Sequence, residues 1–199
     1  MSSLLEILSQ QLGGDTLKKM GGQIGADEKS TGNAVSAALP LLINALSRNA
    51  STDEGANALS GALSKDHDGS ILDSLSGFLD SADSGPGDGI LRHVLGARRP
   101  VVETGLSKSS GLNAGSISKL MGMLAPIVMG ALGKTAREKQ MDPRSLAGYL
   151  GQERNDMEQS EPQTMGLLGK LLDADRDGDV DMSDLAKHGI GLMGKFFRR

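Results

Sequence analysis

The chain has 199 residues, enough for one sizeable domain and a small appendage. It contains no Cys, which excludes disulfides, thiolate nucleophiles and thiolate metal ligands. The net charge of −4 is unevenly spread, because residues 173–184 hold six Asp and one Arg and contribute −5. The other 187 residues therefore sum to +1 and lack the excess of Lys and Arg that is typical of nucleic-acid-binding proteins.

Composition favours an all-α fold. Only four residues are aromatic and none is Trp, so the core must consist of Leu, Ala, Ile, Met and Gly, which suits closely packed helices. Val is scarce and no run alternates with a period of two, so strands are not predicted. We expect a multi-helix bundle.

The first twelve residues predict an amphipathic helix with a Ser3/Glu6 capping box. They lack a basic n-region and carry Glu6 inside the apolar stretch, unlike a signal peptide. The longest uncharged runs, residues 31–47 and 120–133, are interrupted by Pro and predict buried helices, since a membrane span needs about 20 apolar residues. The prediction is a cytoplasmic protein without a transmembrane segment, although export without a cleaved signal would leave the same pattern.

An internal repeat is predicted at a constant offset of 86 residues, where residues 37–50 align with residues 123–136. The matched pairs include Pro40 with Pro126, Ala45 with Ala131, Leu46 with Leu132, and Gly25 with Gly111. Each copy predicts a short helix, a Gly stop and a long helix that the Pro either kinks or begins. Because the long helices are apolar almost all round, we expect them in the interior of the bundle.

Shorter helices are predicted around these copies. Start or stop signals occur at residues 51–54, near Ser70, at Gly96, at Pro100 and at residues 142–143. Residues 152–163 are polar, lack periodicity and end around Pro162, which favours a linker. The predicted organisation is a helical body over residues 1–151, a linker over 152–163 and a C-terminal unit over 164–199.

Five segments occur together between residues 25 and 154: "ALPLLINALSRNAS", "HDGSILDSLSGFL", "GDGILRHVLG", "LAPIVMGALGK" and "LAGYLGQER". In this order they resemble the YidB-like bacterial proteins, a family classed as a domain of unknown function. The resemblance implies an all-helical domain with a three-helix arrangement somewhat similar to a homeodomain. It implies no activity, substrate or catalytic residue, and it does not extend to the C-terminal unit.

The stretch "DADRDGDVDMSD", residues 173–184, has the spacing of an EF-hand calcium loop, with details similar to a dockerin-type loop. Oxygen ligands are expected at positions 1, 3, 5, 7, 9 and 12. These positions are Asp173, Asp175, Asp177, Asp179 (through its backbone carbonyl), Asp181 and Asp184. Gly178 takes position 6, where the chain turns sharply, and Val180 takes the apolar position 8.

Asp184 departs from the EF-hand pattern, which has Glu at position 12. Because Asp is one methylene shorter, bidentate binding requires a tighter loop, so Mg²⁺ is a competitor for the Ca²⁺ that we predict. Apolar residues at helical spacing flank the loop on both sides, as expected for a helix-loop-helix unit and not for an acidic spacer. They are Met165, Leu168, Leu171 and Leu172 before it, and Leu185, Ile190, Met193, Phe196 and Phe197 after it.

Other candidate sites are weaker. Residues 64–75 place Asp66 and Asp68 like loop positions 3 and 5 but lack most other ligands, so we interpret Asp68 as the cap of the next helix. The three His residues fall in unrelated segments, with His93 expected as a hydrogen-bonded core residue, and no catalytic grouping is predicted. The tail's Lys195, Arg198 and Arg199 are interpreted as complementing a helix C-terminus.

The sequence therefore predicts a non-enzymatic calcium-binding protein. EF-hands usually work in pairs and this chain has one, so its apolar faces must rest on the body, on a second copy or on a partner. A calcium-dependent interaction or self-assembly module is the first interpretation. A nucleic-acid-binding regulator and a plain calcium or magnesium buffer are the alternatives, and the near-neutral body makes nucleic acid the less favoured partner.

Overall fold

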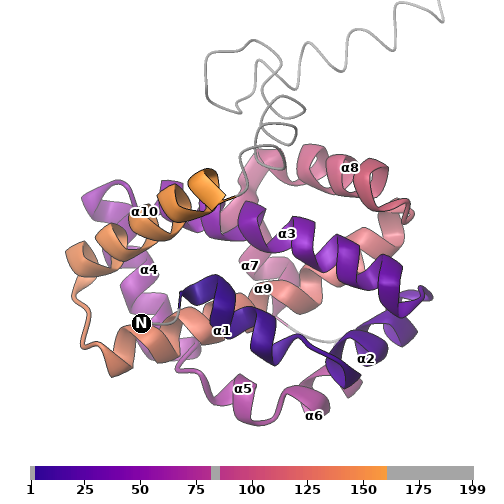
Figure 1. The fold of residues 1–199 in the computed structure, drawn as a ribbon. Helices are drawn as coiled ribbons and strands as arrows, with labels where there is room; N and C mark the ends of the chain where they lie inside the picture. The colour runs from indigo at the N-terminus through magenta and orange to yellow at the C-terminus, as the bar shows by residue number, and fades with distance from the viewer. Residues whose placement is uncertain (1–2, 82–85, 161–199) are drawn as a thin grey trace, which may run out of the picture.

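The computed structural model describes residues 3–81 and 86–160. Its regular elements are α1 (Leu4–Gln11), α2 (Asp15–Ile24), α3 (Glu28–Asn49), α4 (Asp53–Asp66), α5 (Ser70–Asp73), α6 (Leu75–Asp80), α7 (Gly87–Leu95), the 3₁₀ helix η2 (Gly96–Arg98), α8 (Arg99–Ser110), α9 (Ala114–Glu138) and α10 (Pro143–Ser160). No strand occurs in these two ranges, and the predicted all-α fold is confirmed (Figure 1).

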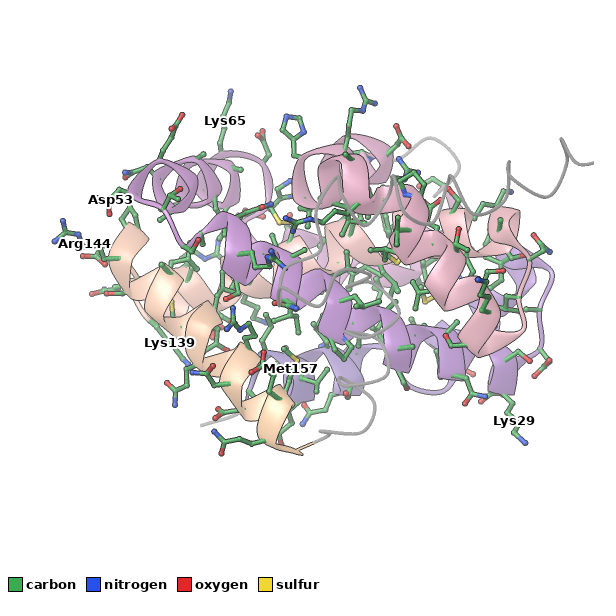
Figure 2. All side chains as sticks on the ribbon, turned by 90° about the horizontal axis from the view of Figure 1, so that it is seen from above. Lys29, Asp53, Lys65, Lys139, Arg144 and Met157 are labelled. Carbon is green, nitrogen blue, oxygen red and sulfur yellow. The ribbon has the colours of Figure 1, made fainter. Side chains whose placement is uncertain are left out.

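The two long helices α3 and α9 form the centre of the bundle, and both bury most of their apolar residues. Within the described ranges, α9 alone is long and apolar enough to cross a membrane, and 78% of its most apolar window is buried inside the protein. This agrees with the predicted role of residues 120–133 as a core helix. Charged side chains such as Lys29, Asp53 and Lys65 lie at the periphery (Figure 2).

Several predicted helix boundaries are confirmed by the hydrogen bonds that form them. The backbone N–H of Glu6 donates to Ser3 Oγ over 3.1 Å, and that of Ser145 donates to Asp142 Oδ1 over 2.7 Å. Helix α7 ends at Leu95, directly before Gly96. The helix expected to begin near Ser70 is instead split into α5 and α6.

Helices α3 and α9 begin in the same way. Each follows a short helix that ends on a left-handed glycine, Gly25 with φ 69° or Gly111 with φ 75°, a conformation that other residues adopt only with strain. Each then has a polar N-cap whose side chain accepts a backbone N–H three residues on. The caps are Asp27, bonded to Ser30, and Asn113, bonded to Ser116; both have φ −71°, with ψ 162° at Asp27 and 160° at Asn113. Each helix also carries its Pro in the interior and not in the first turn.

The shorter helices pack in corresponding ways around this pair. Helix α2 contacts both α3 and α9, and α8 does the same. Helix α4 contacts α9, α10 contacts α3, and the two contact each other. Helix α7 packs closely against α9, whereas α1 packs mainly against α9 and lies apart from α3 (Figure 1).

Helix α10 continues nine residues past the predicted end of the body, through residues 152–160 of the segment expected to be a linker. Glu153 and Met157 explain the difference, since both are buried and lie about one turn apart on the inner face of the helix. One buried residue per turn leaves the remaining positions polar, so the sequence shows little periodicity. Tertiary contacts therefore hold a helix that the local pattern did not predict.

Candidate functional site

The predicted metal loop, with Asp173, Asp175, Asp177, Asp179, Asp181 and Asp184, lies outside the described residues, as does the whole C-terminal unit 164–199. The predicted ligand set therefore stays a prediction from the sequence. Within residues 3–81 and 86–160, no group of three or more His, Asp or Glu side chains is placed to hold a metal ion.

The weaker acidic candidate, residues 64–75, forms a turn between α4 and α5. Asp68 Oδ1 accepts the backbone N–H of Ser70, the first residue of α5, over 3.0 Å, so Asp68 bonds the start of this helix as predicted, although the N-cap position itself is Gly69. These hydrogen bonds lower the pKa of Asp68, and Arg137 lies 3.7 Å from its carboxylate. The carboxylate is thus engaged in holding the turn.

The His residues do not come together. His67 is half-buried in the turn before α5, and that burial lowers its pKa. His93 is exposed on α7, with its Nδ1 2.8 Å from the carbonyl oxygen of Gly89, so the expected hydrogen bond is present but the expected core position is wrong. The apolar neighbours of His93 in sequence lie on the opposite face of α7. His188 lies outside the described residues.

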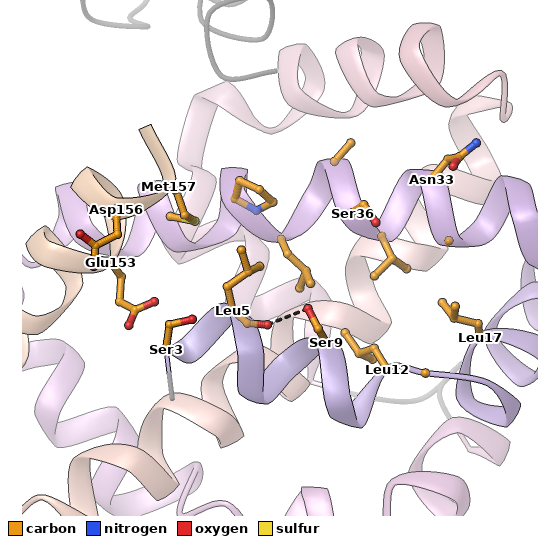
Figure 3. Close-up of a pocket in the computed structure, with 16 residues that line it drawn as sticks. Ser3, Leu5, Ser9, Leu12, Leu17, Asn33, Ser36, Glu153, Asp156 and Met157 are labelled. Carbon is orange, nitrogen blue, oxygen red and sulfur yellow. Dashed lines mark hydrogen bonds between the residues drawn. The ribbon is translucent and has the colours of Figure 1, made fainter. Parts of the chain in front are cut away.

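An open feature of the described fold is an apolar groove of about 680 Å³ between α1 and α3, reached at one end by α10 (Figure 3). Leu5, Leu12, Leu17, Val35, Ala37, Leu39, Pro40 and Met157 supply its apolar lining. Polar groups gather where α10 meets α1, and Figure 3 shows Ser3, Glu153 and Asp156 together there. We call this feature the α1/α3 groove. Its volume falls in the range of ordinary ligand pockets.

Pro40 gives the α1/α3 groove a polar feature on its floor. Proline has no backbone N–H, so the carbonyl of Ser36, four residues earlier, lacks its donor within the helix. Ser36 is exposed and lines the groove. Helix α9 has the same arrangement at Pro126 and Gly122, but there α7 covers it. A Cβ added at Gly87 would overlap the carbonyl oxygen of Gly122, so only glycine permits this close approach.

Glu153 fixes the position of α1 at the polar end of the groove. Its side chain is 5% exposed, and Oε2 accepts the backbone N–H of Leu4 over 3.0 Å. A carboxylate at a helix N-terminus satisfies a free N–H and complements the helix dipole. The contact joins residues 149 positions apart.

Tyr149 lies one turn before Glu153 on α10. Burial, followed by the negative charge of Glu153, raises the pKa of its phenol well above the ordinary value. The Tyr149 hydroxyl is buried near the Glu153 carboxylate but forms no well-aligned hydrogen bond with a described residue. The Lys139 ammonium stacks over its ring, 4.5 Å from the centroid.

The lining of the groove suits binding of an elongated amphipathic segment, because a mostly apolar groove has the carboxylates of Glu153 and Asp156 at its α10 end. Sequence reasoning did not find this site. Leu5, Leu12 and Leu17 have the spacing of ordinary core residues, and nothing local distinguishes a groove lining from a filled core. The one available signal was Pro40, which interrupts the α3 hydrogen bonds on the side that faces α1.

Comparison with known proteins adds one relationship. Residues 6–135 match the family described as bacterial protein of unknown function (DUF937). No curated protein and no solved structure matches the chain significantly. The matched residues run from α1 through most of α9, and thus include α3, most of α9 and three of the four helices that line the groove, namely α1, α2 and α3. The chain therefore belongs to this bacterial family of unknown function.

Proposed function

We propose that this protein is a non-enzymatic, calcium-binding helical protein of the bacterial cytoplasm that uses its C-terminal unit as a calcium-dependent interaction or self-assembly module. The observation that carries the proposal is the spacing of the six Asp residues over 173–184 around Gly178. A calcium ion requires six or more oxygen ligands, and this pattern supplies them at the positions of an EF-hand loop.

The charge of the loop supports a switch. Five side-chain carboxylates within twelve residues repel one another when no ion is bound, so the metal-free loop is loose and the bound ion orders it. The short Asp184 at position 12 favours moderate affinity and leaves Mg²⁺ as a competitor. Moderate affinity suits an ion-dependent interaction better than a calcium buffer.

The body serves as the scaffold in this proposal and contains two related helical units, residues 15–49 and 99–138. The matched glycine stops, N-caps and interior prolines at an offset of 86 residues support the relationship. The helix contacts support it as well, since α2 and α8, the short helices of the two units, each pack on both long helices, α3 and α9. The EF-hand unit then follows the second copy.

Titration calorimetry tests the metal assignment directly. Ca²⁺ and Mg²⁺ are titrated separately into the full chain, into an Asp173→Ala/Asp184→Ala variant and into an Asp66→Ala/Asp68→Ala control. The control removes the same charge from an acidic turn that is not predicted to bind metal. We expect calcium heat in the wild type and the control and none in the loop variant. Equal heats in all three proteins contradict the metal site.

Light scattering after size exclusion tests the interaction function. The proposal predicts a change in mass or hydrodynamic radius between calcium and chelator in the wild type that the loop variant lacks. Binding without any change in mass, shape or partner would favour the buffer. A calcium-independent shift of long DNA at low salt would favour the nucleic-acid alternative.

A further inference from the structure

The sequence predicts a single EF-hand with no second hand to cover its apolar residues, and the body presents a groove with an apolar lining. We propose that residues 185–199, the segment after the predicted metal loop, dock into the α1/α3 groove of the same chain. This inference rests on the proposed calcium binding for its control by metal, and on the structure of the body for the docking itself.

The position of the chain supports an intramolecular contact. Helix α10 ends at Ser160, and Met157, less than one turn earlier, is part of the groove lining. The 39 residues that follow therefore start at the polar end of the groove. Residues 161–184 are far longer than the distance they must cover, since an extended chain spans about 3.3 Å per residue.

The chemistry of the segment matches that of the groove. Residues 185–199 carry apolar residues at helical spacing and end in the basic sequence "KFFRR". Phe196 and Phe197 offer the largest apolar side chains available to the channel, and the groove offers the leucines of α1 and α2 and the apolar face of α3. An amphipathic helix lying in an apolar groove is a common mode of peptide recognition.

Charge orients the segment. Glu153 and Asp156 lie together at the α10 end of the groove, and the tail carries Lys195, Arg198 and Arg199. Glu153 already accepts the Leu4 N–H and is almost fully buried, so a nearby cation lowers the cost of keeping it charged. The basic end of the tail is therefore placed beside α10, and the apolar part of the segment runs along α3.

The comparison with α9 supplies an independent argument. At Pro126, the carbonyl of Gly122 that proline deprives of its donor is covered by α7. At Pro40, the matching residue Ser36 and the proline itself line the groove. A docked C-terminal helix would cover α3 at Pro40 in the way that α7 covers α9 at Pro126.

Tryptophan fluorescence tests the docking in the full chain, because the sequence contains no Trp. Phe197→Trp introduces a single emitter into the proposed docking segment. With calcium, we expect a blue-shifted emission and protection from acrylamide. Adding Ala37→Lys, which places a charge in the groove lining, is expected to abolish both. The matched control is Ala62→Lys, at a half-buried alanine of α4 outside the groove, and it should leave both unchanged.

A second variant guards against misfolding of the body. Arg198→Glu/Arg199→Glu changes only the tail and should red-shift the Phe197→Trp emission while circular dichroism of the body is unchanged. A blue shift that persists in both the Ala37→Lys and the tail variant overturns the proposal. A blue shift that appears only as the mass doubles in light scattering also overturns it, because the groove is then filled by a second copy.

Calorimetry on the same Phe197→Trp protein separates the two proposals. Calcium heat with an emission that groove variants do not change overturns the docking and leaves the metal function standing. Groove-dependent emission without calcium heat supports the docking and contradicts the metal function. Calcium heat together with a calcium-dependent shift that Ala37→Lys abolishes supports both.

Discussion

The two long helices of this protein share a design but have different surroundings. Both α3 and α9 follow a left-handed glycine, begin at a polar N-cap and carry Pro in the interior. Around α9 the proline is buried, and α7 lies so close that Gly87 touches the Gly122 carbonyl. Around α3 the proline is half-buried and faces the α1/α3 groove.

The helix that packs beside each proline, and not the proline itself, determines whether the proline is covered or faces the groove. Helix α7 starts with a glycine and can approach α9 closely, whereas α1 is held at its N-terminus by Glu153 of α10 and packs mainly on α9. The interruption of helical hydrogen bonding is therefore covered by α7 at Pro126 of α9, whereas at Pro40 of α3 it lies beside the α1/α3 groove.

The largest expected effect comes from disrupting the close contact between α7 and α9. Gly87→Ala places a Cβ on the Gly122 carbonyl and must push α7 away from α9, so we expect a loss of about 2–3 kcal/mol in the free energy of unfolding. Gly89→Ala, two residues on in the same helix, is the matched control, because a Cβ there meets no atom within 4 Å. Urea denaturation of both variants measures the difference. Equal midpoints would show that the close approach is unimportant.

The two prolines test the comparison further, because replacing them should change the free energy of unfolding in opposite directions. Pro40→Ala restores a donor for the Ser36 carbonyl at an open surface, and we expect a gain of about 1–2 kcal/mol after the greater freedom of the unfolded chain is counted. Pro126→Ala removes a buried ring from the core, and we expect a loss of about 1–2 kcal/mol. Thermal unfolding followed by circular dichroism tests this. Melting temperatures that shift in the same direction in both variants would contradict the proposed difference between the surroundings of Pro40 and Pro126.

The N-caps provide a smaller effect. Asn113→Ala removes the side-chain acceptor of the Ser116 N–H, and we expect a loss of about 1 kcal/mol. Asn113→Asp keeps the acceptor and should retain most of the stability, so it serves as the conservative control. If the Ala and Asp variants unfold at the same urea concentration, the cap bond does not contribute.

The matching cap of α3 differs from that of α9 in its charge, which predicts a difference in pH dependence. Hydrogen bonds from the Ser30 backbone and hydroxyl lower the pKa of Asp27. The folded chain therefore binds this proton more weakly than the unfolded chain, so the contribution is present above about pH 4 and is lost as the pH falls below it. Asp27→Asn copies the neutral cap of α9, and its unfolding midpoint should vary less between pH 5 and 3 than that of the wild type.

Much of the body could be predicted from local signals. Ser3, Asp142 and Gly96 mark helix ends in the sequence because capping involves residues only a few positions apart. The end of α10 could not be predicted in this way, because Glu153 is held by Leu4, 149 residues away. Contacts of this kind leave no periodic pattern in the sequence.

The two candidate sites differ in the same respect. The ligands of the metal loop lie within twelve consecutive residues, so spacing alone predicts the site although it lies outside the described residues. The α1/α3 groove is assembled from segments near residues 3–17, 32–40 and 153–157, and it depends on how far apart α1 and α3 are held. Only the structure reveals it.

The smallest expected effect concerns Tyr149, which lies one turn from Glu153, the residue that fixes the position of α1. Because burial raises the pKa of its phenol, the folded chain holds this proton more tightly than the unfolded chain. Its contribution to stability is therefore complete below about pH 10 and is lost as the pH rises further. Tyr149→Phe removes a buried hydroxyl that forms no well-aligned hydrogen bond with a described residue, so we expect no loss of stability at pH 7 and a shallower decline above pH 10. Urea midpoints of both proteins from pH 8 to 11 measure this. Parallel curves would show that ionisation of the Tyr149 phenol does not contribute to the loss of stability above pH 10.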